Sequence, residues 1–339
     1  MRDPLLCPLD HHGDAETGDG LLDFAVNVFP DARPAWLDEA LHAAIGEVAA
    51  YPEATRARQA IADAHGRPVD EVLPTAGAAE AFTLVARARP WRRPAVVHPQ
   101  FTEPHSALLA AGHEVTTVAT RPEDGFALDV AAVPDDADLV VVGNPTNPTG
   151  VLHPAERLRD LLRPGRVVVV DEAFMDVVPD EPESLLTDRA AGLVVLRSLT
   201  KHWSIPGIRA GYLVGHPALV ADLARHQTPW SVSTPALAAI EACLTPRALA
   251  ESLARAVALG TWRDHLARGL AARDVEQVVS AASFVLARPG AGARQALRDR
   301  GIAVRRADTF PGLDDSWVRI AVRPPDLADR LLLALDELG

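Results

Sequence analysis

The sequence predicts an α/β protein whose mostly parallel sheet is covered by helices, followed by a smaller α+β domain. Five short Val-rich runs do not alternate in polarity, as expected for strands that are covered on both faces. These runs are residues 94–98, 138–142, 166–170, 192–196 and 210–214. Amphipathic stretches such as 76–88 and 154–162 lie between them, and strands that alternate with helices indicate βαβ units.

The character of the chain changes after about Trp230. Helices rich in Ala, Leu and Arg are expected first, then shorter strands and a final helix, in the order 235–243, 246–269, 283–287, 302–305, 317–322 and 325 to the end. The first 30 or so residues are loop-like and are expected to pack on the rest as an arm. We therefore predict an N-terminal arm (1–35), a large domain (36–229) and a small C-terminal domain (230–339).

Composition narrows the possible functions. A chain of 339 residues with 48% hydrophobic and 23% charged residues is typical of a globular protein with more than one domain. The net charge of −13 argues against nucleic acid or an anionic membrane as a partner. Cys7 and Cys243 form neither a disulfide framework nor a metal-binding motif. Without a membrane-spanning run or a signal-peptide core, we expect a cytoplasmic protein with no metal.

Lys201 is the only lysine among the 33 basic residues. Arginine can replace lysine on a surface, but its guanidinium stays protonated and cannot act as an amine nucleophile. A lysine amine can lose its proton in a suitable site and form a Schiff base with an aldehyde. The alternative is that Lys201 has no special role and is present by chance in an arginine-rich chain. The residues around Lys201 must distinguish a reactive amine from such a lysine.

Chemically versatile side chains follow three consecutive predicted strands. The segment 143–150 contains Asn147, the next strand runs into Asp171, and the third runs into Lys201. Ligands of open α/β sheets bind beyond the carboxyl ends of the strands. We therefore expect an amide, a carboxylate and an amine at one rim of the sheet.

In combination these motifs resemble those of a known family. Asn147-Pro-Thr-Gly, Asp171-Glu-Ala, and Ser198-Leu-Thr-Lys201 followed by Arg209 are similar to the fold-type-I enzymes of the class I/II aminotransferase group, which use pyridoxal 5′-phosphate (PLP). The resemblance covers nearly the whole chain. It implies the fold-type-I transferase fold, a PLP cofactor and an enzyme.

The resemblance also assigns roles to residues. Lys201 would hold PLP as a Schiff base, and Asp171 would pair with the protonated pyridine nitrogen. Asn147 would donate its amide to the phenolic oxygen of the ring. Ser198 and Arg209 would hold the cofactor phosphate, because arginine offers charged and bidentate contacts.

Further cofactor contacts are implied upstream. The amides of Gly77, Ala78 and Ala79 at a helix N-terminus would receive the same phosphate, although the family often has an acidic or polar residue where this chain has Ala79. Phe101 would stack on the ring, the alternative being an ordinary core phenylalanine. Tyr51 would reach the phosphate bound in a partner subunit, which implies a homodimer.

Two reactions fit the resemblance. The main expectation is decarboxylation of L-threonine O-3-phosphate to (R)-1-aminopropan-2-yl phosphate in cobalamin synthesis, because Phe174 stands where histidinol-phosphate aminotransferases usually carry Tyr, and because the segment 198–209 resembles the decarboxylase. The alternative is transamination of a phosphorylated amino compound such as histidinol phosphate with 2-oxoglutarate. A ligand-sensing module without catalysis is a third possibility, which the simultaneous presence of Lys201, Asp171 and Asn147 disfavours.

The anchors for the substrate's anionic groups would choose the reaction. PLP weakens the Cα bond that stands perpendicular to its ring, so the orientation of the carboxylate decides which bond breaks. Arg305 and Arg319 are the candidate anchors, with Arg323 as a further candidate on the face of Arg319. His11 and Asn27 would line the same pocket, which we expect to accept a small phosphorylated amino acid.

Overall fold

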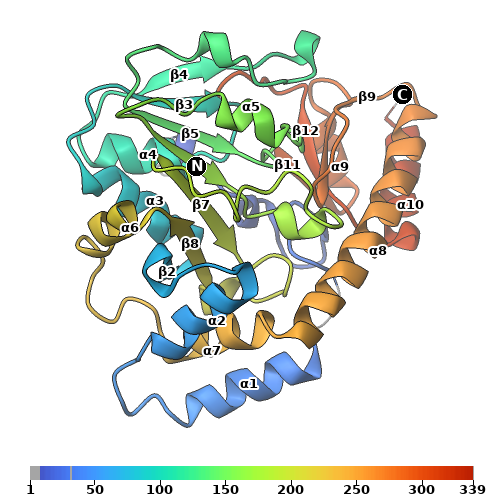
Figure 1. Ribbon diagram of the computed structural model, residues 1–339. Helices are drawn as coiled ribbons and strands as arrows, with labels where there is room; N and C mark the ends of the chain where they lie inside the picture. Colours follow the sequence, from blue (N-terminus) through green and yellow to red (C-terminus); the bar gives the residue numbers. More distant parts are fainter. Residues whose placement is uncertain (1–7, 31–32, 339) are drawn as a thin grey trace.

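The computed structural model describes residues 8–30 and 33–338, which form two sheets with helices around them (Figure 1). The larger sheet contains, in spatial order, β2 (Val72–Thr75), β8 (Gly211–Gly215), β7 (Leu193–Ser198), β6 (Val167–Asp171), β5 (Leu139–Gly143), β3 (Pro94–His98) and β4 (Thr116–Ala119). The strands from β7 to β4 are mutually parallel, while β8 is antiparallel to both β7 and β2. The predicted α/β class with a mostly parallel sheet is confirmed.

Both faces of this sheet are covered, which explains the unbroken Val runs. Along β6, Val168 and Val170 point into one hydrophobic core, and Val167 and Val169 point into the other. The first core also receives side chains from α1 (Ala35–Ile45), α2 (Thr55–His65), α5 (Ala155–Arg159) and α7 (Thr234–Cys243). The second receives side chains from α3 (Gly77–Ala88), α4 (Glu103–Ala110) and α6 (Pro217–Ala224). Successive strand residues alternate between faces, so every position is apolar.

The smaller sheet contains, in spatial order, β1 (Leu22–Phe24), β11 (Ile302–Arg306), β12 (Val318–Ala321), β10 (Phe284–Arg288) and β9 (Glu276–Gln277). Its core is closed by α8 (Pro246–Ala271), α9 (Ala293–Asp299) and α10 (Pro325–Asp336). In Figure 1 the long helix α8 runs from the vicinity of α7 to the small sheet, where α10 lies beside it.

The structure differs from the sequence-based expectations in the N-terminal arm, in helix α5 and in strands β2 and β4. The N-terminal arm is not only loop: β1 pairs in parallel with β11, and its backbone thereby joins the small sheet. Helix α5 is shorter than the predicted 154–162, because the chain turns at Leu161 and Leu162 ahead of the left-handed Gly165. Strands β2 and β4 were not predicted, since their short sequences carry no Val run.

Short helical turns complete the backbone. They are η1 (Pro8–Asp10), η2 (Gly13–Glu16), η3 (Val69–Glu71), η4 (Pro122–Asp124), η5 (Val130–Ala132), η6 (Met175–Val177) and η7 (Pro206–Ile208). Helix α7 buries its apolar side in the core of the large sheet, although its residues follow position 230. The proposed boundaries at 35/36 and 229/230 stay a prediction.

Gly211 shows how closely β8 approaches the start of α3. A methyl group on Gly211 would lie 2.8 Å from the carbonyl oxygen of Arg197 and 2.9 Å from Cα of Gly77. Both neighbours are backbone atoms that cannot move without shifting β7 or the α3 N-terminus. Only glycine therefore fits between these elements.

We predict that Gly211→Ala lowers the free energy of unfolding by about 1–3 kcal/mol, the usual cost of overpacking. Gly207→Ala is the matched control, because apart from its own chain neighbours no described residue has an atom within 4 Å of the methyl group that it would add. Chemical denaturation of both variants measures the difference. Equal stability of the two variants would contradict the close-packing interpretation.

Candidate functional site

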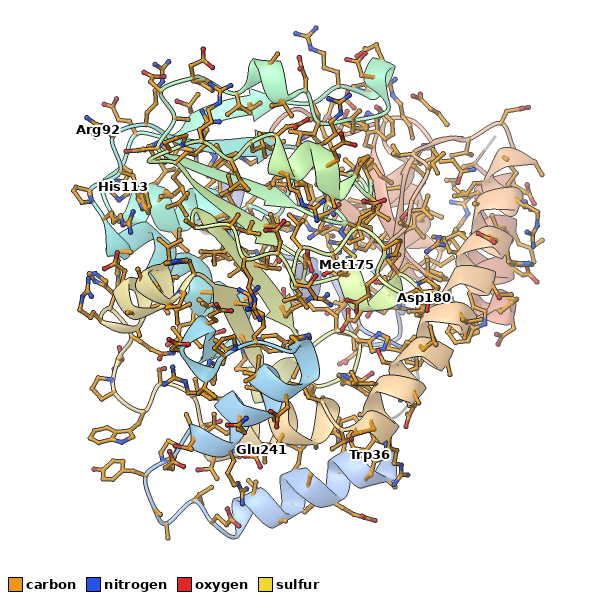
Figure 2. All side chains as sticks on the ribbon, in the orientation of Figure 1. Trp36, Arg92, His113, Met175, Asp180 and Glu241 are labelled. Carbon is orange, nitrogen blue, oxygen red and sulfur yellow. The ribbon has the colours of Figure 1, made fainter. Side chains whose placement is uncertain are left out.

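The carboxyl ends of β5, β6 and β7 lie side by side, as the strand order requires. Gly143 at the end of β5 is paired with Asp171 at the end of β6, and Asp171 is paired with Leu196 in β7. Beyond these ends follow the loop with Asn147 and the turn with Lys201. Met175, labelled in Figure 2, is fully buried where the chain after β6 continues through the interior.

Lys201 lies in a turn after β7 and is largely surrounded by protein. Its Nζ donates to Oγ of Ser198 at 3.3 Å and lies 5.5 Å from the centre of the Phe174 ring. Loss of hydration lowers the pKa of the amine, and the charges of Arg209 and Arg319 act in the same direction, whereas Asp171 raises it. A lysine in such surroundings loses its proton more readily than one in water.

Asp171 is a carboxylate without a directly paired cation. Its Oδ1 accepts the amide of Ala173 at 3.1 Å, and among residues 8–30 and 33–338 no basic side chain lies within 4 Å of it. Burial raises the pKa of this carboxyl group, while Lys201 and the amide of Ala173 lower it. A partly accessible carboxylate in this state is suited to receive a cationic ring nitrogen.

Arg209, Ser198 and the first turn of α3 form a cradle for an anion. Nη2 of Arg209 would lie only 2.6 Å from a methyl group on Gly77, so the guanidinium lies directly against the helix N-terminus. Gly77 has φ +76°, a conformation that favours glycine. Oγ of Ser198 lies 2.8 Å from Oγ1 of Thr200. Thr200 was not among the residues predicted from the sequence.

The helix N-terminus itself is only partly satisfied from within the chain. The side chain of Glu80 accepts the amide of Ala76 at 2.6 Å, and its carboxylate lies in the first turn. In the part of the chain that the structure describes, no acceptor outside the helix receives the amides of Ala78 and Ala79. These amides and the Arg209 guanidinium fit a phosphate group.

Phe101 follows β3 and is partly buried between two aromatic neighbours. Its ring centre lies 6.2 Å from that of Phe82 and 5.7 Å from that of His12 in the N-terminal segment. Nε2 of His12 donates to the Glu103 carboxylate at 2.7 Å, and this contact raises the pKa of the imidazole. The N-terminal segment therefore borders the site from the side of α4.

Arg305 and Arg319 are directly opposite each other on β11 and β12. Both are buried, with 1% and 5% of their surface exposed. Burial lowers the pKa of Arg305 to about 10 and lowers the pKa of Arg319 as well. The charge of Arg305 lowers the pKa of Arg319 further. Within the described residues, neither guanidinium has a carboxylate within 4 Å.

Neutral oxygen atoms hold the two guanidinium groups in place. Arg305 donates to the carbonyl of His11 at 2.6 Å and to Oγ1 of Thr309 at 2.7 Å. Arg319 donates to Oδ1 of Asn147 at 2.7 Å and to the carbonyl of Ala25 at 2.5 Å. These acceptors fix the geometry but do not neutralise the charge, so the pair is suited to bind an anion.

Asn27 belongs to the same cluster. With its amide oxygen turned toward Arg319, it accepts from Nε at 3.2 Å and from Nη1 at 3.0 Å. The structure thus brings together Asn27, Asn147 and Arg319, which the sequence places in three distant segments. His11 lies nearby through its carbonyl, while its ring contacts Glu16 at 2.9 Å, and burial lowers the pKa of that ring.

Arg323 has a different environment from the other two arginines. Its guanidinium donates to the carbonyls of Asp23 at 2.8 Å and Val26 at 2.7 Å, and it lies 3.7 Å from the Asp23 carboxylate. These contacts fasten the N-terminal segment to the small domain. The structure therefore gives Arg323 an anchoring position behind the cluster rather than a free guanidinium, and its role toward a substrate stays a prediction.

Tyr51 lies away from this cluster, on the surface. Its ring is 76% exposed and stacks on Trp230, which is 60% exposed, with ring centres 4.3 Å apart. Two large aromatic side chains that face solvent together are typical of a contact surface. The structure of a single chain leaves the contact of Tyr51 with a partner subunit a prediction.

A clamp that sequence reasoning missed holds the loop with Asn147. Asn144 accepts the amide of His153 at 2.7 Å and donates to the carbonyl of the same residue at 3.2 Å. Nε2 of His153 lies 3.1 Å from Oγ1 of Thr146. The spacing of nine residues between Asn144 and His153 carries no recognisable motif, so only the fold shows the pairing.

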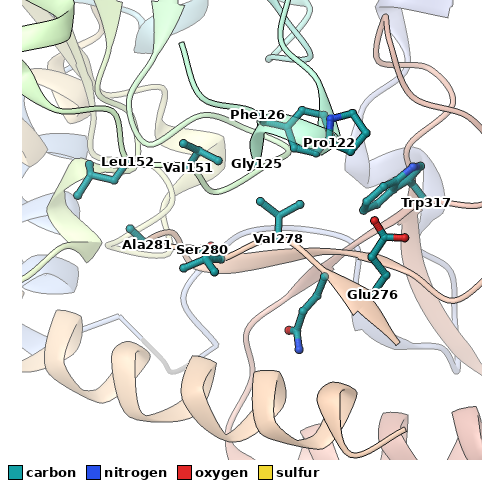
Figure 3. A pocket seen from close by; sticks show the side chains of 12 residues that line it. Pro122, Gly125, Phe126, Val151, Leu152, Glu276, Val278, Ser280, Ala281 and Trp317 are labelled. Atoms are coloured by element: carbon teal, nitrogen blue, oxygen red, sulfur yellow. The ribbon is translucent and has the colours of Figure 1, made fainter. Parts of the chain in front are cut away.

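A separate cavity of about 440 Å³ lies where residues 122–126 and 151–152 meet residues 276–281 (Figure 3). Phe126, Val278 and Trp317 contribute apolar walls, and Glu276 contributes a carboxylate. Its lining, all in described residues, contains none of the predicted site residues. The cavity therefore lies outside the cluster around Lys201.

Two further features concern only the described residues. None of their helices combines the length and the apolar character that crossing a membrane requires. No group of three or more His, Cys, Asp or Glu side chains among them is arranged to hold a metal ion. Cys243 is buried as a free thiol, whereas Cys7 lies outside the described residues.

Comparison with known proteins gives consistent matches. The sequence model of the family "Aminotransferase class I and II" matches residues 19–335. A histidinol-phosphate aminotransferase of Mycobacterium tuberculosis is 51% identical over 93% of this chain and 87% of its own length. A threonine-phosphate decarboxylase of Salmonella typhimurium is 32% identical over 94% of this chain and 91% of its own. The solved histidinol-phosphate aminotransferase of Clostridium acetobutylicum is 25% identical, with a TM-score of 0.85 over 94% of this chain and 99% of that one.

The unneutralised Arg305–Arg319 pair predicts stabilisation by anions. We expect inorganic phosphate at constant ionic strength to raise the melting temperature of the native protein, because a ligand that binds only the folded state stabilises it. Arg319→Met should lose part of this shift, whereas Arg300→Met, an exposed control on the same domain, should keep it. Equal shifts in both variants would show that the pair does not bind the anion.

Proposed function

The chain belongs to the aminotransferase class I and II family of PLP-dependent enzymes, and on this premise we propose that it transfers the amino group of a phosphorylated amino compound, such as histidinol phosphate, to 2-oxoglutarate. The observation that carries the proposal is the buried pair Arg305 and Arg319, which lacks a carboxylate partner among the described residues and adjoins Asn147. The M. tuberculosis relative, at 51% identity, supports transamination better than the 32% relative supports decarboxylation.

The residues around Lys201 fit the cofactor. Arg209, Ser198 and the amides of Gly77, Ala78 and Ala79 would hold its phosphate, and Asp171 would face its ring nitrogen. Oδ1 of Asn147 accepts from Arg319, and the amide nitrogen of Asn147, which has no acceptor among the described residues, would donate to the ring oxygen. Phe101 would cover the ring face. PLP supplies an aldehyde that combines with amines and a ring that withdraws electrons from the reacting carbon.

Lys201 would act as the base of the reaction in addition to holding the cofactor. The lowered pKa of its amine favours the uncharged form of Nζ, which can take up a proton from the substrate and return it. Asp171 stays close enough to compensate a positive charge but is not hydrogen-bonded to the amine in the described chain. The proton can therefore move at Nζ without a fixed ion pair having to break.

Arg305 and Arg319 would bind and orient the anionic groups of the substrate. Asn27 and the carbonyl groups of His11 and Ala25 hold the guanidinium planes. The N-terminal segment lies over the pair and is fastened by Arg323, so it would also exclude water from the bound substrate. Fixed charges in a dry site bind anions more strongly than the same charges in water.

Decarboxylation of L-threonine O-3-phosphate, the main expectation from the sequence, remains the second candidate. It is favoured by Phe174, which supplies no hydroxyl next to Lys201, and by the Salmonella relative over 94% of the chain. Both substrates carry phosphate, so the arginine pair suits either. The two reactions differ in the bond that would break at Cα of the substrate. Transamination breaks the Cα–H bond, whereas decarboxylation breaks the bond between Cα and the carboxylate, a group that histidinol phosphate lacks.

The assembly and the location are proposed on similar grounds. Tyr51 and Trp230 form an exposed aromatic pair, and Ile45 and Val48 are also more than half exposed. We infer that this surface is covered in a homodimer, where Tyr51 would reach the partner's cofactor phosphate. We also infer that the enzyme works in the cytoplasm, without nucleic acid or membrane partners.

Product analysis tests the reaction. The PLP-loaded protein is incubated with histidinol phosphate and 2-oxoglutarate, and separately with L-threonine O-3-phosphate. We expect glutamate from the first mixture and no carbon dioxide from the second. Carbon dioxide without glutamate would establish the second candidate, and neither product would refute a phosphorylated substrate of these two kinds.

A single lysine allows unambiguous mapping of the cofactor. Borohydride reduction of the yellow protein should fix the pyridoxyl label on Lys201, because no other side-chain amine is present. Lys201→Arg should keep the fold and the charge but abolish turnover, since a guanidinium cannot form the link. A labelled α-amino terminus with an unmodified Lys201 would refute the assignment.

Asp171→Asn should bind PLP but lose most activity. A neutral amide cannot hold the ring nitrogen protonated, so electron withdrawal from the reacting carbon weakens. We expect less than about a tenth of the wild-type rate, a barrier increase of more than ~1.4 kcal/mol. Rates and cofactor absorbance of both proteins measure the effect, and a rate above that level would remove Asp171 from this role.

A further inference from the structure

Two phenylalanines bridge the junction between the large and small sheets. Phe174 lies in the loop after β6, and Phe284 lies in β10. Their ring centres are 5.0 Å apart and their planes are nearly perpendicular, at 85°. With Ala173 and Ala282 they form a small apolar cluster distinct from the cores of the two sheets. Phe284 is fully buried and Phe174 is 6% exposed.

Each ring of this aromatic pair lies next to a cationic side chain of the site, Phe174 next to Lys201 and Phe284 next to Arg319. Nζ of Lys201 lies 5.5 Å from the centre of Phe174, and Cζ of Arg319 lies 5.4 Å from the centre of Phe284. Both separations are within the range of cation–π attraction. The rings therefore form an unbroken line of contacts from the amine on the large sheet to the guanidinium on the small sheet.

We propose that the Phe174–Phe284 pair fixes the spacing between Lys201 and Arg319 and thereby selects substrates by the length of the chain between their amine and their anionic group. The inference rests on the proposed function, in which Lys201 is the reacting amine and Arg319 is an anion anchor. It makes both phenylalanines positioning residues, since they act through the two charged side chains rather than by touching the substrate.

Packing explains why this pair acts as a spacer. Two rings in edge-to-face contact cannot approach further without overlap, and a buried interior leaves no space for them to slide apart. The hydrogen bonds of Arg319 to Asn147 and to the carbonyl of Ala25 hold the guanidinium from the sides. The ring of Phe284 packs against the face of the Arg319 guanidinium. Loss of this ring would allow the guanidinium to tilt and to take more than one position.

Aminoalkyl phosphates with two, three and four carbons between nitrogen and the phosphate ester oxygen probe the spacing. Their dissociation constants for the PLP-loaded protein are measured by calorimetry, without any turnover. We expect wild-type protein to prefer one length over its neighbours by roughly fourfold or more, the usual contribution of one well-packed methylene group. Phe284→Ala should reduce this preference to less than about twofold, and Phe284→Leu should give an intermediate value.

Phe126→Ala is the matched control, because it removes an equally buried ring from the cluster around Trp317, outside the line between Lys201 and Arg319. It should keep the wild-type length preference. The proposal is overturned if Phe284→Ala, or Phe284→Leu should the alanine variant not fold, retains the wild-type preference. If wild-type protein binds none of the probes, or if Arg319→Met binds them as wild type does, the proposed function fails instead.

Discussion

The arrangement of the site depends on the contacts that the guanidinium of Arg319 makes. It reaches Asn147 from the large sheet, the carbonyl of Ala25 and the amide of Asn27 from the N-terminal segment, and the ring of Phe284 from the small sheet. All of these partners are neutral. The charge is therefore held in a fixed position at the meeting point of three segments, yet it remains available for an anion.

Charge is distributed differently on the two sides of Lys201. Behind the strand ends, Arg197 lies 3.1 Å from Glu172 and also pairs with Glu181, and Glu172 accepts the amide of Leu185 at 2.7 Å. This network pairs its charges within the chain and supports the end of β6, although Nε of Arg197 has no hydrogen-bond partner among the described residues. In front, Asp171 and the Arg305–Arg319 pair have no directly bonded counter-charge among the described residues. The charges of the Arg197 network therefore stabilise the fold, whereas Asp171 and the Arg305–Arg319 pair are suited to bind a ligand.

Membership in the aminotransferase class I and II family defines the cofactor and the type of chemistry, while the choice of reaction depends on finer geometry. Transamination and decarboxylation both use a basic lysine and an electron-withdrawing ring, and they differ in which bond of the substrate is held perpendicular to that ring. In the function that we propose, Arg305, Arg319 and the N-terminal segment would determine this orientation. The choice of reaction would then depend on contacts between segments of the chain rather than on the motifs around Lys201.

The sequence by itself determined the α/β class, the positions of the Val-rich strands and the motifs with Asn147, Asp171 and Lys201, because each of these is a local pattern. Valine runs mark strands covered on both faces, and parallel strands place their carboxyl ends at one rim whatever the rest of the chain does. The same patterns indicated Arg305 and Arg319 as candidates but not that they face each other across β11 and β12.

Only the tertiary structure decided the long-range pairings. The parallel pairing of β1 with β11, the clamp between Asn144 and His153, and the contact of Phe174 with Phe284 each join residues without a shared motif. Arg323 illustrates the same limit, since its guanidinium serves backbone carbonyls of the N-terminal segment that no sequence pattern connects to it. Hydrogen-bond partners and burial depend on which distant segments the fold brings together. Composition and motif spacing do not predict which segments these are.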